Sequence, residues 1–118
     1  MRDYEKLEVY QLAEDLVVEV YRISKDFPSD ERFGLTAHLR KTALSIPSNI
    51  SEGAARGSDR DFSNFLNIAV GSTSELQCQL RIAYRLTFLE ESTWKDSTEK
   101  CVSIRKMLFA LMSRLSGR

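Results

Sequence analysis

The chain has 118 residues, of which 42% are hydrophobic, 29% are charged, five are glycine and two are proline. This length and composition predict a single globular domain over residues 1–118 and exclude a disordered chain. Seventeen basic and seventeen acidic side chains give a formal net charge of zero, which excludes nucleic-acid binding through overall positive potential alone. The charged N-terminus and the lack of a long apolar run predict a cytoplasmic protein without a signal peptide or membrane span.

The first predicted element is a helix over residues 7–27. Its apolar residues recur at steps of three and four: Val9, Leu12, Ala13, Leu16, Val17, Val20, Tyr21 and Ile23. They cover about half of the helix circumference, more than the roughly 100° stripe that packs against a single core, so we expect a second buried contact. Pro28 ends the helix because it pushes Phe27 out of the α region.

The second predicted helix begins between residues 29 and 36 and runs to about Arg56. Its apolar seam consists of Leu35, Leu39, Ala43, Ile46, Ile50 and Ala54. Pro47 lies inside the helix and lacks a backbone donor, so we expect a kink or a break over residues 45–48. Gly57 is placed to cap this helix, and Ser58 with Asp61 three residues later predicts the start of the next.

Two longer helices follow, over residues 59–89 and 93–116, separated by a break at residues 90–92. Their apolar positions again recur at helical spacing, and the sequence has neither strand alternation nor hairpin turn signals. Four helices with short connections make sequential neighbours antiparallel. The predicted fold is therefore an all-α, antiparallel up-and-down four-helix bundle with its second helix kinked at Pro47.

A polar stripe runs along the second predicted helix at steps of four and three: His38, Thr42, Ser45, Asn49, Glu52 and Arg56. This spacing places it beside the apolar seam, where polar groups need partners from another helix. The third helix offers Asn64, Asn67, Ser72, Ser74 and Glu75, and small residues at Gly53, Ala54, Gly71 and Ser72 permit close approach. Three interpretations are open: a hydrogen-bond network or subunit seam built on Ser45, Asn49, Glu52, Arg56 and Glu75; an exposed Glu52–Arg56 pair; or a reactive site.

Charge is distributed unevenly along the chain. Residues 1–30 hold four basic and eight acidic side chains, net −4, and residues 91–118 hold six basic and three acidic ones, net +3. Either the first and last helices pair, or the last helix offers an anion-binding face. The candidate nucleic-acid contacts are Arg40, Lys41, Arg56, Arg60, Lys100, Arg105, Lys106, Arg114 and Arg118.

The residues do not assemble a recognisable catalytic motif. His38 is the single histidine, so the paired Glu-x-x-His motifs of di-iron bundles are missing from the sequence. Gly53 and Gly57 lack the Lys-Ser/Thr of a phosphate loop. Cys78 and Cys101 fit no metal spacing, and we expect both to be reduced, small, buried residues. We therefore expect no metal, no cofactor and no enzyme activity; a small enzyme around His38 or Glu52 remains an alternative.

The stretch from Ser45 to Gly53, Ser-Ile-Pro-Ser-Asn-Ile-Ser-Glu-Gly, is not one that helical periodicity alone would yield. It is followed by Arg56, Ser58, Phe62, Phe65, Leu66, Ile68, Ala69, Gly71, Ser72, Glu75 and Leu76. With these residues the chain resembles the bacterial four-helix-bundle family encoded in intervening sequences of 23S ribosomal RNA, often labelled ribosomal-like. The likeness covers nearly the whole chain, including Leu7, Val9, Ala13, the Phe27-Pro28 stop and Gly34-Leu35-Thr36.

This resemblance implies a bundle that forms a ring-shaped homopentamer. Similar proteins serve as accessory subunits of reverse transcriptases in diversity-generating retroelements and bind nucleic acid through basic surfaces. The leading hypothesis is a non-catalytic, oligomeric binding or scaffold protein that associates with RNA, a reverse transcriptase or a ribosome-associated partner. The alternative hypothesis is a nucleic-acid-binding protein that contacts RNA directly through basic surfaces of the second and fourth helices.

Overall fold

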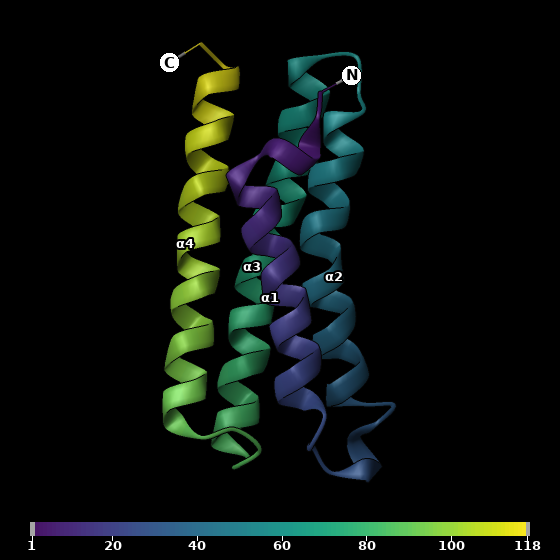
Figure 1. Cartoon of the computed structure of the whole chain (residues 1–118), viewed down its shortest axis with the longest axis vertical. Coiled ribbons are helices and arrows are strands. Elements are labelled where there is room, and N and C mark those ends of the chain that lie inside the picture. Colours follow the sequence, from purple (N-terminus) through teal and green to yellow (C-terminus); the bar gives the residue numbers. More distant parts are fainter. Residues whose placement is uncertain (1, 118) are drawn as a thin grey trace.

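The computed structural model describes residues 2–117 and contains four helices (Figure 1). They are α1 (Glu8–Ser24), α2 (Leu35–Ala54), α3 (Asp59–Arg85) and α4 (Glu91–Leu115), and short 3-10 turns at Tyr4–Lys6 and Ser29–Glu31 precede α1 and α2. Sequential helices run in opposite directions in a bundle of 45 × 23 × 20 Å, and no strand occurs within residues 2–117. The predicted all-α up-and-down bundle is confirmed.

One apolar stripe from each helix forms the core. Its largest fully buried side chains include Leu16, Leu39, Ile46, Ile50, Phe62, Leu66, Leu76, Leu80, Ile104 and Leu108. The broad apolar arc of α1 is only partly covered, because Leu12, Val18 and Tyr21 are 37–51% exposed. The second buried contact expected for this helix is therefore not made within the chain, and these side chains lie at the surface.

Pro47 does not break α2, which is an unbroken helix from Leu35 to Ala54. Of the two expectations at Pro47, the structure excludes the break, because the neighbouring Ile46 and Ile50 are fully buried in the core; the kink stays a prediction. Burial of large apolar side chains is worth roughly 1.5–3 kcal/mol each, enough to offset the roughly 3 kcal/mol cost of an interior proline.

Several helix ends differ from the sequence prediction: α1 ends at Ser24 instead of Phe27, and α4 begins at Glu91 instead of residue 93. The third helix ends at Arg85, four residues early, where Thr87 takes a left-handed φ of 69°. The amides of Thr87 and Phe88 then donate to the carbonyls of Tyr84 and Ala83, the pattern of a Schellman cap. Glycine usually marks that position, so a threonine there does not predict a helix end. Gly57, which was expected to cap α2, has no positive φ.

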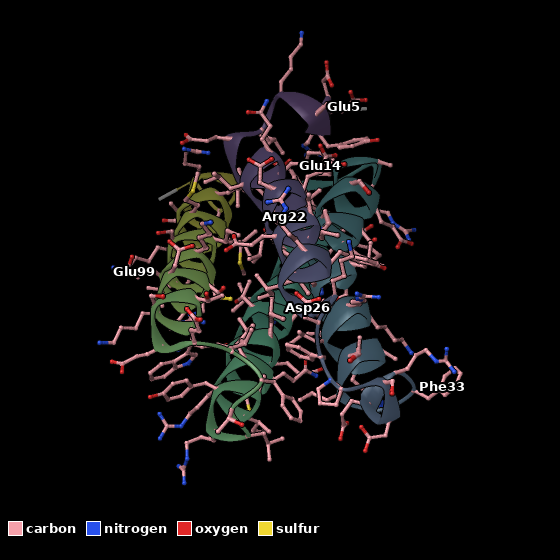
Figure 2. All side chains as sticks on the ribbon, turned by 60° about the horizontal axis from the view of Figure 1, so that its bottom comes forward. Glu5, Glu14, Arg22, Asp26, Phe33 and Glu99 are labelled. Carbon is pink, nitrogen blue, oxygen red and sulfur yellow. The ribbon has the colours of Figure 1, made fainter. Side chains whose placement is uncertain are left out.

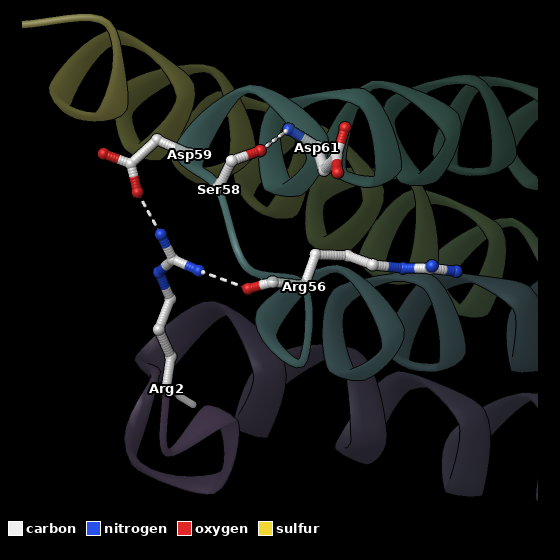
Figure 3. Close-up of polar contacts among 5 residues, drawn as sticks. All are labelled: Arg2, Arg56, Ser58, Asp59 and Asp61. Carbon is white, nitrogen blue, oxygen red and sulfur yellow. Dashed lines mark hydrogen bonds and ion pairs between the residues drawn. The ribbon is translucent and has the colours of Figure 1, made fainter.

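The N-terminal residues are fastened to the turn between α2 and α3 (Figure 3). Arg2 forms an ion pair with Asp59 and donates to the backbone carbonyl of Arg56 at 3.2 Å. Its guanidinium also lies 4.7 Å from the ring centroid of Phe62. Ser58 accepts a hydrogen bond from the amide of Asp61 at 3.1 Å, which confirms the predicted helix cap.

At Gly53, α2 and α3 approach each other closely. A Cβ at this position would lie 2.7 Å from Cβ of Phe65 and 2.9 Å from Cδ1 of Phe62. Both distances are shorter than van der Waals contact, so the helices can pack this closely only with glycine here. Gly71, by contrast, has no atom within 4 Å of the position its Cβ would take and does not mediate such an approach.

Candidate functional site

The polar stripe of α2 is hydrogen-bonded to α3 in its middle part. The hydroxyl of Thr42 lies 2.9 Å from a carboxylate oxygen of Glu75, and the hydroxyl of Ser45 lies 2.6 Å from that of Ser72. Asn49 is half-buried and donates its amide to the carbonyl of Ser45 at 2.7 Å. The Thr42–Glu75 and Ser45–Ser72 contacts join two helices of one chain, whereas the Asn49 bond lies within α2, so Thr42 and Ser45 have a packing role without a second subunit.

The polar stripe was expected to be covered by another helix along its whole length. In the structure, both of its ends are exposed. His38 is exposed at one end. At the other end Glu52 and Arg56 form an exposed pair at 3.0 Å, with side chains 55% and 45% exposed, and Arg56 lies over the ring of Phe65. This pair matches the simpler interpretation of two residues four apart on a helix surface. The sequence pattern could not separate these ends from the middle, because burial depends on where α3 covers the stripe.

The predicted partners on α3 divide in the same way. Ser72 and the exposed Glu75 form hydrogen bonds to α2, whereas Asn64, Asn67 and Ser74 are exposed and have no hydrogen bond to α2 within residues 2–117. Ser74 instead lies near Arg105 of α4.

The basic residues proposed to contact nucleic acid do not form one surface. Arg40 is held within the chain, because it donates to Ser24 at 2.9 Å and stacks on Tyr21. Lys100 is paired with Glu19 of α1 and, at 3.1 Å, with Asp96. The Glu19–Lys100 contact supports the interpretation that the acidic first helix and the basic last helix pair. As a nucleic-acid contact, Lys100 is disfavoured because both acids neutralise it.

The remaining basic candidates are scattered over the bundle. Lys41, Arg60, Lys106 and Arg114 are exposed, on three different helices. Arg118 lies outside the described residues. Arg105 lies in a groove with a second arginine, Arg81, and we take that groove as the candidate site.

This α3–α4 groove has a volume of about 380 Å³ and is lined by Ser74, Gln77, Cys78, Arg81, Trp94, Thr98 and Arg105. Its lining includes two guanidinium groups and no carboxylate. Arg105 donates to the side-chain oxygen of Gln77 at 3.1 Å, which orients its guanidinium across the groove. Neither Arg81 nor Arg105 forms an ion pair with any acid in residues 2–117. Their charges are therefore available to an anionic ligand.

An aromatic pair lies beside these arginines. The rings of Trp94 and Tyr84 stack with centroids 4.3 Å apart and an interplanar angle of 6°, and Trp94 also lines the groove. Ser74 and Arg81 are seven residues apart on α3, so the groove is roughly 10 Å long along the helix axis. Guanidinium groups next to an aromatic ring suit a ligand with both a phosphate and a flat base.

Arg81 and Trp94 were not among the site residues predicted from the sequence. A signal existed, because Ser74, Gln77, Cys78 and Arg81 lie at helical spacing on one face of α3. That signal carried no information about α4, whose Arg105 and Trp94 complete the groove only once the two helices pack.

The two cysteines are expected to react differently with a thiol reagent. Cys78 is exposed in the groove, whereas Cys101 is buried, and burial raises the pKa of its thiol to about 12. The expectation that both are buried is thus wrong for Cys78. Native protein should incorporate one equivalent of iodoacetamide at neutral pH and denatured protein two, as measured by intact mass. Rapid modification of both thiols in folded protein would contradict the packing around Cys101.

The described part of the chain contains no group of three or more His, Cys, Asp or Glu side chains arranged to hold a metal ion. His38 borders an open groove of about 420 Å³ with Phe33, Lys41 and Glu75, and neither cysteine lines it. Within residues 2–117, the helices lack the apolar length that a membrane crossing requires.

Known proteins resemble the chain in sequence and in structure. The sequence model of the 23S rRNA-intervening sequence protein family matches residues 5–110. A crystal structure of a protein of unknown function from the S23 ribosomal protein family of Bacteroides thetaiotaomicron superposes with a TM-score of 0.79 and 21% identity, covering 88% of this chain and 97% of that one. No curated protein matches significantly. Because the family match spans almost the whole chain, the protein belongs to the 23S rRNA-intervening sequence protein family.

Proposed function

We propose that this protein is a non-catalytic, self-associating, cytoplasmic binding protein and that its α3–α4 groove holds single-stranded RNA. The observation that carries the RNA assignment is the groove lined by Arg81, Arg105 and Trp94 without a carboxylate. Neutral overall charge is compatible with such a site, because the acidic side chains lie elsewhere and the local field decides where phosphates bind.

Single-stranded RNA fits the groove better than a duplex. Bases of a single strand are free to stack on aromatic side chains, and such stacking tolerates any sequence. A duplex hides its bases and offers mainly phosphates and 2′-hydroxyls. The ligand that matches the groove is thus a nucleotide unit of an unpaired strand, with the phosphate at the guanidinium groups and the base near Trp94.

Replacing Arg81 with alanine is expected to weaken binding of a fluorescent single-stranded RNA about tenfold, because a charge-assisted contact to phosphate is worth about 1.5 kcal/mol. Arg105→Ala should act similarly. Each substitution should also reduce the slope of log affinity against log salt concentration by about one unit, because one phosphate contact is lost. Fluorescence anisotropy between about 50 and 200 mM salt measures both effects. Bound RNA should also slow alkylation of Cys78, which lines the groove.

The matched control is Lys106→Ala, next to Arg105 on α4 but outside the groove lining. It should leave affinity within about twofold of the wild type. Equal losses for Lys106→Ala and Arg105→Ala would mean diffuse electrostatic attraction instead of a groove, and affinity that does not fall with salt would defeat the RNA assignment altogether.

Self-association is supported by apolar side chains that the bundle leaves at its surface. Nine large ones among residues 2–117 are at least 37% exposed, from Leu12 of α1 to Phe109 of α4, and Phe33 reaches 83%. Several exposed apolar groups in a chain of this size are typical of a protein that buries them in an assembly. Light scattering at micromolar concentration should give a mass well above 13.5 kDa, and a monomer would exclude the proposal.

A further inference from the structure

Phe33 is the most exposed of the large hydrophobic side chains in the described chain, at 83%. It lies in the connection between α1 and α2 and projects outward beside α2 (Figure 2). The guanidinium of Arg32 lies 4.9 Å from the centroid of its ring. The two side chains form a projection, the Arg32–Phe33 knob, that offers an apolar ring and a positive charge together.

The backbone that presents this knob is well ordered by hydrogen bonds. The carboxylate of Glu31 turns back and accepts from the amide of Leu35 at 3.1 Å, and the amide of Gly34 donates to the carbonyl of Glu31 at 3.0 Å. A side chain at Gly34 would meet that carboxylate at 2.9 Å. The loop therefore has a fixed shape that holds Phe33 in water, and hydrophobic burial opposes such exposure unless something covers the ring.

A groove with matching chemistry lies between α1 and α4. Its volume is about 400 Å³, and its apolar floor consists of Leu12, Leu16 and Ile104. Asp15, Asp96 and Glu99 stand around it. Lys100 also lines this groove, but its ammonium is already bonded to Glu19 and Asp96. Asp15 and Glu99 form no ion pair within residues 2–117, so the rim keeps a net negative charge.

We infer that the Arg32–Phe33 knob of one copy docks into the α1–α4 groove of a second copy. The ring of Phe33 covers the floor formed by Leu12, Leu16 and Ile104, and the guanidinium of Arg32 meets the carboxylates of Asp15 and Glu99. This assignment rests on the proposed self-association and names the two surfaces that produce it.

The positions of the knob and the groove decide what kind of assembly results. Figure 2 shows Phe33 and Glu99 on opposite sides of the bundle. A contact between two different surfaces is heterologous, so each copy uses its knob on one neighbour and its groove on the other. Repetition of this contact gives a closed ring or an open filament. It does not give a two-fold dimer, in which the same surface of each copy meets itself.

The test uses two variants that each destroy one surface. The knob variant carries Arg32→Ala and Phe33→Ala, and the groove variant carries Asp15→Lys and Glu99→Lys. All four residues are exposed, so both variants should fold, which circular dichroism checks. Size-exclusion chromatography with light scattering should show an oligomer for the wild type and a 13.5 kDa monomer for each variant.

An equimolar mixture of the two variants should regain a complex of two chains. The groove variant still has an intact knob and the knob variant an intact groove, so one native contact forms and the complex stops there. As a matched control, Asp30→Asn removes a charge from the same loop as the knob and should leave the wild-type oligomer unchanged.

The outcomes separate this inference from the broader proposal. An oligomeric wild type whose variants keep their mass, or a mixture that stays monomeric, overturns the knob and groove assignment but leaves self-association in place. A monomeric wild type overturns both. As a check independent of charge, Phe33→Cys with Leu12→Cys in a Cys78→Ala background should give intermolecular disulfides on oxidation, and their absence would also count against the contact.

Discussion

Replacing Phe62 with alanine is expected to lower the free energy of unfolding by about 3–5 kcal/mol. Phe62 is 1% exposed, in the first turns of α3, where it packs beside Gly53 of α2 and under the guanidinium of Arg2. Its removal leaves a cavity and also takes away the ring on which the N-terminal anchor rests. The measurement is urea unfolding followed by circular dichroism, with the slope checked for two-state behaviour.

Phe109→Ala is the matched control for this substitution. The same side chain is removed from a helix, but Phe109 of α4 is 51% exposed. Its loss should change the free energy of unfolding of the monomer by about 0.5 kcal/mol or less. Equal effects at Phe62 and Phe109 would mean that the core does not have the composition described above.

Gly53→Ala is expected to lower the free energy of unfolding by about 1–3 kcal/mol, because the added methyl group overpacks the contact between α2 and α3. Helix propensity acts in the opposite direction, since alanine is favoured over glycine by about 1 kcal/mol. Overpacking should prevail because one close atom is Cβ of Phe65 at 2.7 Å, which moves only with the backbone. Thermal unfolding and urea unfolding both show whether Gly53→Ala raises or lowers the free energy of unfolding.

Gly71→Ala separates the two effects, since its added methyl group meets nothing within 4 Å. This variant should gain about 0.5–1 kcal/mol from propensity alone. In a Phe62→Ala background, Gly53→Ala should cost less than in the wild type, because one of the two closest atoms is gone. A stabilising Gly53→Ala in the wild type would show that the helices move apart easily at this point.

Much of the fold could be predicted because apolar periodicity reports directly on helices. Leu16, Ile50, Phe62 and Ile104 recur in register with their neighbours, and all of them are in the core. Helix ends were harder to predict. Thr87 takes a left-handed conformation that threonine seldom adopts, and its Schellman bonds form because the chain must reverse there. Pro47 left a kink and a break open, and burial of Ile46 and Ile50 beside it keeps the helix unbroken.

The candidate sites were less predictable for a related reason. The α2 stripe was visible as a pattern, but only the position of α3 decides that Thr42 and Ser45 are covered while Glu52 is not. Charge alone suggested Lys100 as a ligand contact, and two nearby acids neutralise it. Arg81 became a candidate site residue only because Arg105 of α4 lies in the same groove.

The sequence by itself determined the number of helices, their order, the face that each one buries and the family to which the chain belongs. These features depend on residues that are close along the chain, where spacing and chemistry are read directly. Tertiary structure alone decided which polar groups pair, which cations stay available and which grooves form. Each of those depends on side chains from two helices, and their distance is fixed by packing, as the close approach at Gly53 illustrates.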